Sequence, residues 1–147
     1  MIQLSRSNST TTNHVYLNLY DEMTSTDYAV LVSVKSQLTG KTKTFRVTTS
    51  YTNKDRYTQM TIFVITSSGG ENLESGVVFL GSTDYPLGFY DVTIYQNNNN
   101  TNLDPDNAIK TIYTGLANLS ATSAVDPVTY TEYTTNDSDT ESVYITF

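Results

Sequence analysis

Short runs of alternating apolar and polar residues are the feature that most limits how this chain can fold. Val15 and Leu17 alternate with Tyr16 and Asn18, and comparable runs recur between Gly, Pro, Asn and Asp residues. A period of two is the pattern of a β-strand with one buried face. The runs predict strands over residues 28–36, 42–49, 57–66, 77–80, 89–96 and 109–113, with 116–119 as a continuation of the last one past Gly115, and further short pieces over 128–133 and 143–147.

The residue types agree with this pattern. Twelve Tyr and many Thr, Val and Ile favour strands, and strong helix formers are uncommon. About seven to nine strands at spacings of roughly 8–12 residues predict an all-β fold, an antiparallel β-sandwich that is immunoglobulin-like or jelly-roll-like. We expect a polar N-terminal arm over residues 1–13 and a sandwich domain over 14–120. Residues 121–147 are either a C-terminal extension that adds a strand to a neighbour or final strands of the same domain.

Charge and cysteine content exclude several function classes. The net charge is −7, and only eight basic residues are scattered along the chain, so we expect no nucleic-acid partner. Cysteine is absent, which excludes disulfides, thiolate metal sites and a cysteine nucleophile. Apolar runs such as residues 62–65 are far shorter than the ~20 residues of a membrane span, and residues 1–14 lack the apolar core of a secretory signal. We therefore expect no membrane partner.

Catalytic residue patterns are missing from the sequence. His14 is the only histidine, and no glycine-flanked serine turn accompanies it to form a nucleophile elbow. No pair of carboxylates lies in an apolar stretch that would shift a pKa for acid–base catalysis. We predict that the chain is not an enzyme, binds no cofactor, and uses His14 as a structural or exposed residue.

One loop concentrates hard oxygen ligands. Asn102, Asp104 and Asp106, with Asn107 beside them, are of the kind that Ca²⁺ prefers at alternating loop positions. The glycine and the bidentate Glu of an EF-hand loop are missing. Asx side chains next to a proline also cap turns through hydrogen bonds to the backbone. We therefore predict turn capping and no metal site in this loop, and keep Asn102, Asp104 and Asp106 as metal-ligand candidates only as the alternative.

Two further patterns concern surfaces. Phe63 and Ile65 load the face of the predicted strand 57–66 that lies opposite Met60, Ile62 and Val64, so that face needs a covering loop or a partner. Tyrosines also recur along the chain, and they predict either an aromatic platform for sugars or ordinary cross-strand ladders. The tyrosines concerned are Tyr16, Tyr20, Tyr90, Tyr95, Tyr130 and Tyr133.

Four segments, in order, carry a family resemblance. They are RYTQMTI over residues 56–62, GVVFL over 76–80, GFYDVTIYQ over 88–96 and TNLDP over 101–105. This series resembles a family of small tailed-phage proteins with RYN-x-F-x-I, G-x-V-x-L, G-x-Y-x-Y-x-I-Y and T-N-L-D-P motifs, and the similarity covers roughly residues 15–119. Met60 stands where the family usually has an aromatic residue, and Asp91 stands where a second Tyr is common.

The resemblance implies a virion structural protein, assembled in the host cytoplasm. Such a protein would coat the capsid or act as a neck or tail adaptor, with other virion proteins and its own copies as partners. It would bury its apolar strand face in these contacts, which makes Phe63, Ile65 and Val78, together with the terminal Phe147, the protein-interface candidates. A tail appendage that binds a host receptor or glycan is the alternative, and a cellular adhesion or enzyme-accessory domain is a third class.

Overall fold

A computed structural model describes residues 1–53 and 57–122 of the 147-residue chain. The described part consists mainly of β-strands, joined by loops that contain 3-10 turns. The strands are β1 (Ile2–Arg6), β2 (Thr11–Leu17), β3 (Val30–Ser36), β4 (Thr42–Val47), β5 (Thr49–Asn53), β6 (Tyr57–Ile65), β7 (Val77–Phe79), β8 (Gly88–Gln96) and β9 (Lys110–Ala121). The 3-10 turns are η1 (Tyr20–Glu22), η2 (Ser68–Gly70), η3 (Leu73–Ser75) and η4 (Pro105–Asn107).

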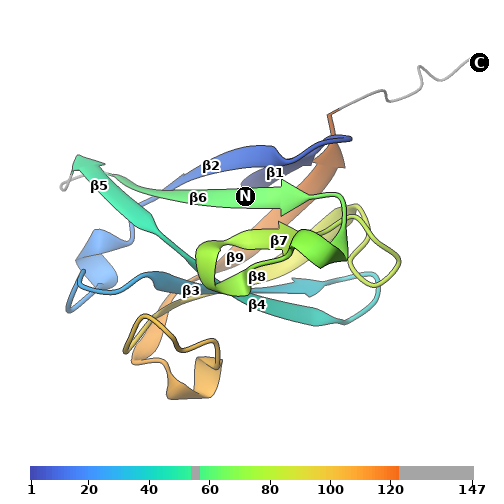
Figure 1. Ribbon diagram of the computed structural model, residues 1–147. Coiled ribbons are helices and arrows are strands. Elements are labelled where there is room, and N and C mark those ends of the chain that lie inside the picture. The colour runs from blue at the N-terminus through green and yellow to red at the C-terminus, as the bar shows by residue number, and fades with distance from the viewer. Residues whose placement is uncertain (54–56, 123–147) are drawn as a thin grey trace, which may run out of the picture.

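The strands form two sheets (Figure 1). A curled five-stranded sheet has the order β1-β9-β8-β3-β4, and a second sheet has the order β2-β6-β5 with β7 added beside β6. Neighbouring strands are antiparallel except β1 with β9 and β6 with β7. The prediction of a mostly β fold is confirmed.

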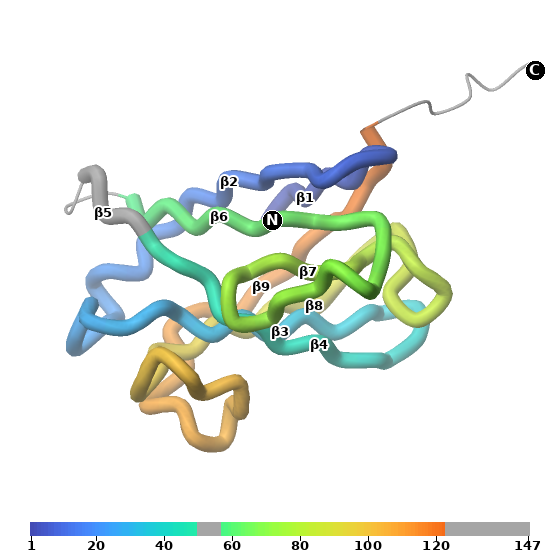
Figure 2. The backbone as a smooth tube through the Cα atoms, in the orientation of Figure 1, coloured from blue at the N-terminus to red at the C-terminus, as the bar shows by residue number. Residues whose placement is uncertain are grey.

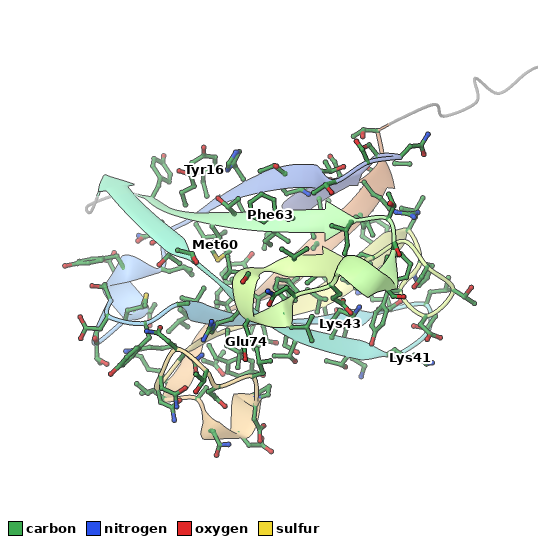
Figure 3. The ribbon with its side chains drawn as sticks, viewed as in Figure 1. Tyr16, Lys41, Lys43, Met60, Phe63 and Glu74 are labelled. Atoms are coloured by element: carbon green, nitrogen blue, oxygen red, sulfur yellow. The ribbon has the colours of Figure 1, made fainter. Side chains whose placement is uncertain are left out.

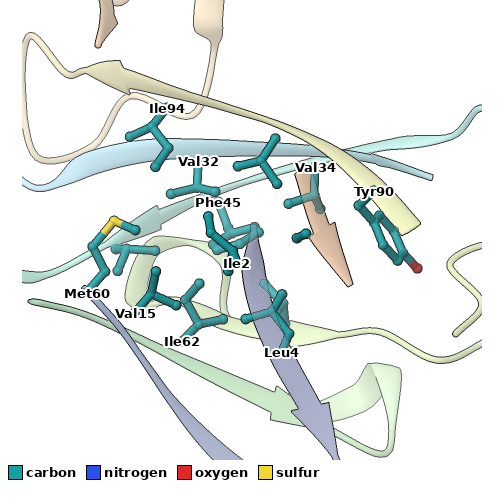
Figure 4. Close-up of a cluster of buried hydrophobic side chains, with 14 of the residues drawn as sticks. Ile2, Leu4, Val15, Val32, Val34, Phe45, Met60, Ile62, Tyr90 and Ile94 are labelled. Carbon is teal, nitrogen blue, oxygen red and sulfur yellow. The ribbon is translucent and has the colours of Figure 1, made fainter. Parts of the chain in front are cut away.

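The core lies between the two sheets. Side chains from both sheets point toward one another, with Val32, Phe45 and Ile94 on one side and Met60 and Ile62 on the other (Figure 4). Phe45, Met60 and Ile94 are fully buried. Alternate residues of the strands predicted over 28–36, 42–49 and 57–66 therefore supply this core, as a period of two requires.

Residues 1–13 differ from the expected polar arm. β1 pairs in parallel with β9, and its residues Ile2 and Leu4 are buried in the core, with 7% and 2% of their surface exposed. The free edge of β1 is satisfied by a side chain, because Asn13 accepts a hydrogen bond from Ser5 N (2.7 Å) and donates one to Ser5 O (3.0 Å). β1 is thus the edge strand of the five-stranded sheet, and residues 11–13 already belong to β2 of the second sheet.

β9 is one continuous strand, so residues 116–119 continue the strand predicted over 109–113. It runs for 12 residues through Gly115 and contains an irregularity opposite Ile94 and Tyr95 of β8. A Cβ atom at Gly115 would lie 2.4 Å from the Tyr113 hydroxyl oxygen. The missing side chain of Gly115 therefore leaves room for the Tyr113 ring to lie along the strand. The glycine has a packing role here and does not end the strand.

A partly buried ion pair links the two sheets. Lys43 of β4 places its Nζ 2.5 Å from Glu71 Oε1, and the pair is shielded, with 11% and 21% of the two side chains exposed. Both partners also bind β7: Glu71 Oε1 accepts from Phe79 N at 3.0 Å, and Lys43 Nζ donates to Phe79 O at 2.9 Å. The Lys43 ammonium lies 4.4 Å from the centroid of the Tyr85 ring. The pair therefore occupies the free edge of β7 and ties it to β4.

Candidate docking surfaces

Four of the exposed large apolar side chains lie near one end of the five-stranded sheet. Phe89 and Leu116 project from the outer face of β8 and β9, and Leu38 and Leu87 flank them from the neighbouring loops. Their exposed fractions are 79% for Leu38, 44% for Leu87, 51% for Phe89 and 43% for Leu116. We call these four residues the end patch. Leu38, Leu87 and Phe89 line a shallow groove of about 330 Å³.

The loop that carries Leu38 is held in place by hydrogen bonds. Gly40, with φ of +73°, closes the turn by donating to Ser36 O at 2.8 Å. Thr39 Oγ1 then donates to Asp84 O at 2.7 Å, and Lys41 pairs with the Asp84 carboxylate at 2.7 Å. The hairpin tip is therefore tied to the loop before β8, and the two halves of the groove are fixed relative to each other.

The loop that carries Leu87 is anchored from the core. The Tyr90 hydroxyl donates to Pro86 O at 2.6 Å, and its ring is only 1% exposed. Burial raises the pKa of Tyr90 to about 12, with a smaller contribution from Tyr85. Because both loops are braced, the end patch presents its apolar surface without a large ordering cost on binding.

The second sheet offers a different surface. Its outer face carries the half-buried Phe63 and Val77, which line a groove of about 490 Å³ together with Thr10 and Ile65. Figure 3 shows Phe63 on β6 and Tyr16 on the outer side of β2, with Met60 turned toward the other sheet. The exposed tyrosines of this sheet, Tyr16 and Tyr57, are 57% and 56% exposed.

His14 lies on this same outer face, opposite Thr61 in the register of β2 and β6. It is exposed, and its Nδ1 lies 2.9 Å from Gln59 Nε2 and 3.3 Å from Thr61 Oγ1. The groups that these hydrogen bonds bring to the ring are an amide and a hydroxyl. His14 is therefore held as a polar member of a strand-to-strand network.

The predicted interface residues occupy different environments. Phe63 points outward and is half-buried, whereas Ile65 is only 8% exposed and lies under η2, where a Cβ on Gly70 would be 3.5 Å from Ile65 Cδ1. Val78 is fully buried in the core, so its side chain does not reach the surface. Phe147 lies outside the described residues. A loop therefore covers Ile65, whereas Phe63 lies at the edge of the groove.

The predicted metal-ligand residues lie in the loop between β8 and β9, which projects from the rest of the fold (Figure 2). Asn102 Oδ1 accepts from Asp104 N, and Asp104 Oδ1 accepts from Asp106 N, both at 3.0 Å. Asn102 also donates to Asn97 Oδ1 at 2.9 Å. The side-chain oxygens thus serve as turn caps. Over residues 1–53 and 57–122, no three His, Cys, Asp or Glu side chains are grouped to hold a metal ion.

The end patch was missed by sequence reasoning. Leu38 and Leu87 lie in connections between strands, and Phe89 and Leu116 lie on the outward side of their strands. The signal in the sequence is a large apolar side chain at turn positions, where polar residues are usual. Leu38 lies two residues before Gly40, and Leu87 directly precedes Gly88.

Comparison with family models, with curated proteins and with solved structures found no match. Within the described residues, no helix is both long and apolar enough to cross a membrane.

Proposed function

We propose that this chain is a non-enzymatic docking module that joins a larger protein assembly through the end patch. Together with the resemblance of its motifs, this supports a phage virion structural protein, capsid-associated or acting as a neck or tail adaptor. We also propose that the two sheets form a β-sandwich, with β1 closing one edge.

The observation that carries the proposal is the exposure of four large apolar side chains at one site. Apolar patches of this kind on an isolated chain mark interaction surfaces. Full burial of a Leu or Phe side chain stabilises a complex by roughly 1.5–3 kcal/mol. Because Leu87, Phe89 and Leu116 are already about half buried, we estimate about 1 kcal/mol for each of them on docking, and about 1–2 kcal/mol for the more exposed Leu38. The partner expected from this chemistry is a protein with a complementary apolar surface.

The test uses two neighbouring positions on β9. Leu116 and Thr114 both point outward from the same strand, two residues apart, and both are exposed. We expect Leu116→Asp to abolish incorporation into purified particles of the encoding virus, and Thr114→Asp to leave incorporation unchanged. Electron microscopy of intact particles then locates the chain. If Leu116→Asp and Phe89→Asp both incorporate like the unmodified chain, the end patch is not the docking surface.

A receptor- or glycan-binding appendage is the second candidate, and a specific arrangement favours it. Tyr16 faces Gln59 across β2 and β6, and Tyr57 lies two residues from Gln59 on the same strand face. Two exposed tyrosine rings beside an amide suit a neutral saccharide, because the rings cover sugar C–H groups while the polar groups form hydrogen bonds. Saturable binding on a glycan array that Tyr16→Ala removes would support this candidate.

A further inference from the structure

The second sheet is built without formal charge. β2, β5, β6 and β7 contain no Asp, Glu, Lys or Arg, although the chain as a whole is 16% charged. The neighbouring Glu71 is paired with Lys43. The five-stranded sheet differs, because its strands carry Arg6, Lys35, Lys43, Arg46, Asp91 and Lys110.

This distribution matters for contact between identical chains. A chain of net charge −7 repels its own copy, and like charges that meet across an interface oppose association. In a dimer with twofold symmetry, the same surface of each copy forms the interface, so the charges of a charged face would lie against those of the identical face on the partner. The outer face of the uncharged sheet avoids this penalty. It also offers aromatic and apolar residues with few charges, which is the composition of interface centres.

We propose that two copies of this chain pack the outer faces of their uncharged sheets together about a twofold axis, centred on Phe63. Phe63 lies toward the end of β6 that is remote from the 54–56 connection, and it borders the groove lined by Thr10 and Val77. Two β-sheets pack face to face at about 10 Å, with their strands within about 30° of each other. The contact does not use the end patch, which lies on the other sheet.

The size of the face sets the strength of the contact. The strands β2, β5, β6 and β7 have 7, 5, 9 and 3 residues, and at about 3.3 Å per residue and about 4.8 Å between strands they offer a footprint of roughly 400 Å² per protomer. This is about half of the roughly 800 Å² per partner in a standard stable complex. The dimer is therefore reversible, with a dissociation constant in the micromolar range or above, and is favoured where copies are concentrated on a particle.

The first test is sedimentation equilibrium of the full chain at loading concentrations from about 5 to 500 μM. We expect a monomer–dimer equilibrium that Phe63→Asp weakens at least tenfold. The matched control is Phe89→Asp, which introduces the same change at an exposed Phe of the other sheet and leaves the equilibrium unchanged. A chain that stays monomeric at all concentrations overturns the inference, as does a dimer that Phe89→Asp breaks and Phe63→Asp does not.

The second test does not touch the half-buried phenylalanine. Thr12 is exposed and faces Phe63 directly in the register of β2 and β6, so it tolerates substitution without loss of folding. Thr12→Lys and Thr12→Glu should each dimerise at least tenfold more weakly, because like charges then meet across the twofold axis. An equal mixture of the two variants should dimerise again. Failure of the mixture to do so overturns the twofold arrangement.

These outcomes are separate from the proposed docking function. If Phe63→Asp no longer dimerises but is still incorporated into particles normally, the proposed role of the end patch is unaffected. Loss of incorporation by Leu116→Asp with an intact dimer tests the docking function alone.

Discussion

Removing the charge of Glu71 tests how much the buried ion pair stabilises the fold. Glu71→Gln keeps the size of the side chain and an oxygen that can accept from Phe79 N. It leaves the Lys43 ammonium, at 11% exposure, without its counter-ion. Breaking a buried pair from one side typically costs 3–5 kcal/mol. Lys43 retains its bond to Phe79 O and its contact with the Tyr85 ring, so we expect about 2–3 kcal/mol.

The measurement is urea unfolding of Glu71→Gln, Lys43→Met and the double variant. For a chain of 147 residues, a decrease of about 2–3 kcal/mol in the free energy of unfolding corresponds to a fall in Tm of roughly 6–10 °C. The double variant should lose less free energy of unfolding than the two single variants added together, because the second substitution no longer leaves an unpaired charge.

The matched control is the exposed ion pair between Lys41 and Asp84. It has a similar N–O distance of 2.7 Å, but 55% and 58% of its side chains are exposed. Its hydrogen bond and the Asp84 charge raise the pKa of Lys41. Exposed pairs contribute little to stability, so Asp84→Asn should leave the Tm unchanged within error. Equal effects at Glu71 and Asp84 would refute the argument that burial makes the first pair matter.

Four further predictions follow from single residues. Thr58 is fully buried and its hydroxyl has no hydrogen-bond partner among the described residues, so Thr58→Val should raise the free energy of unfolding by about 1 kcal/mol in urea titrations. Gly76 has φ of +73°, and a Cβ there would lie 3.2 Å from Arg46 O, so Gly76→Ala should cost about 1–3 kcal/mol in the same assay. Because the pKa of Tyr90 is raised in the folded chain, its contribution to the free energy of unfolding is fully present below pH 10 and is lost as pH rises toward 12. Tyr90→Phe should therefore flatten this part of the pH–stability curve, measured by circular dichroism. Millimolar Ca²⁺ should leave the Tm unchanged in calorimetry, because the oxygens of Asn102 and Asp104 already accept backbone hydrogen bonds; a rise in Tm would assign a metal site to this loop.

The sequence predicts the strands whose alternation is strong and local. β3, β4, β6 and β8 lie within one or two residues of the predicted ranges, because their inward positions carry Val, Ile, Phe or Met in steady alternation. β1 was not predicted because only Ile2 and Leu4 mark it, and its pairing partner is far along the chain. Such a strand is specified by tertiary contacts and not by local preference.

The surfaces were predictable only in part. The outward position of Phe63 follows from alternation, and so does the burial of Met60 on the opposite face of β6. The end patch depends on how two loops meet, through Thr39 with Asp84 and Tyr90 with Pro86. No periodic pattern encodes contacts between loops, so Leu38 and Leu87 could be placed together only from the three-dimensional structure.

The pairing of β1 with β9 has a consequence for how the chain reaches its native state. Ile2 lies beside Ala117 and Leu4 beside Leu119, so these contacts join residues that are far apart along the chain. Contacts between such distant residues close the largest loop in the fold and are slow to form. Residues placed ahead of Met1 by a fusion partner would adjoin this closing step. A tag at that end should therefore slow refolding more than the same tag attached after Phe147.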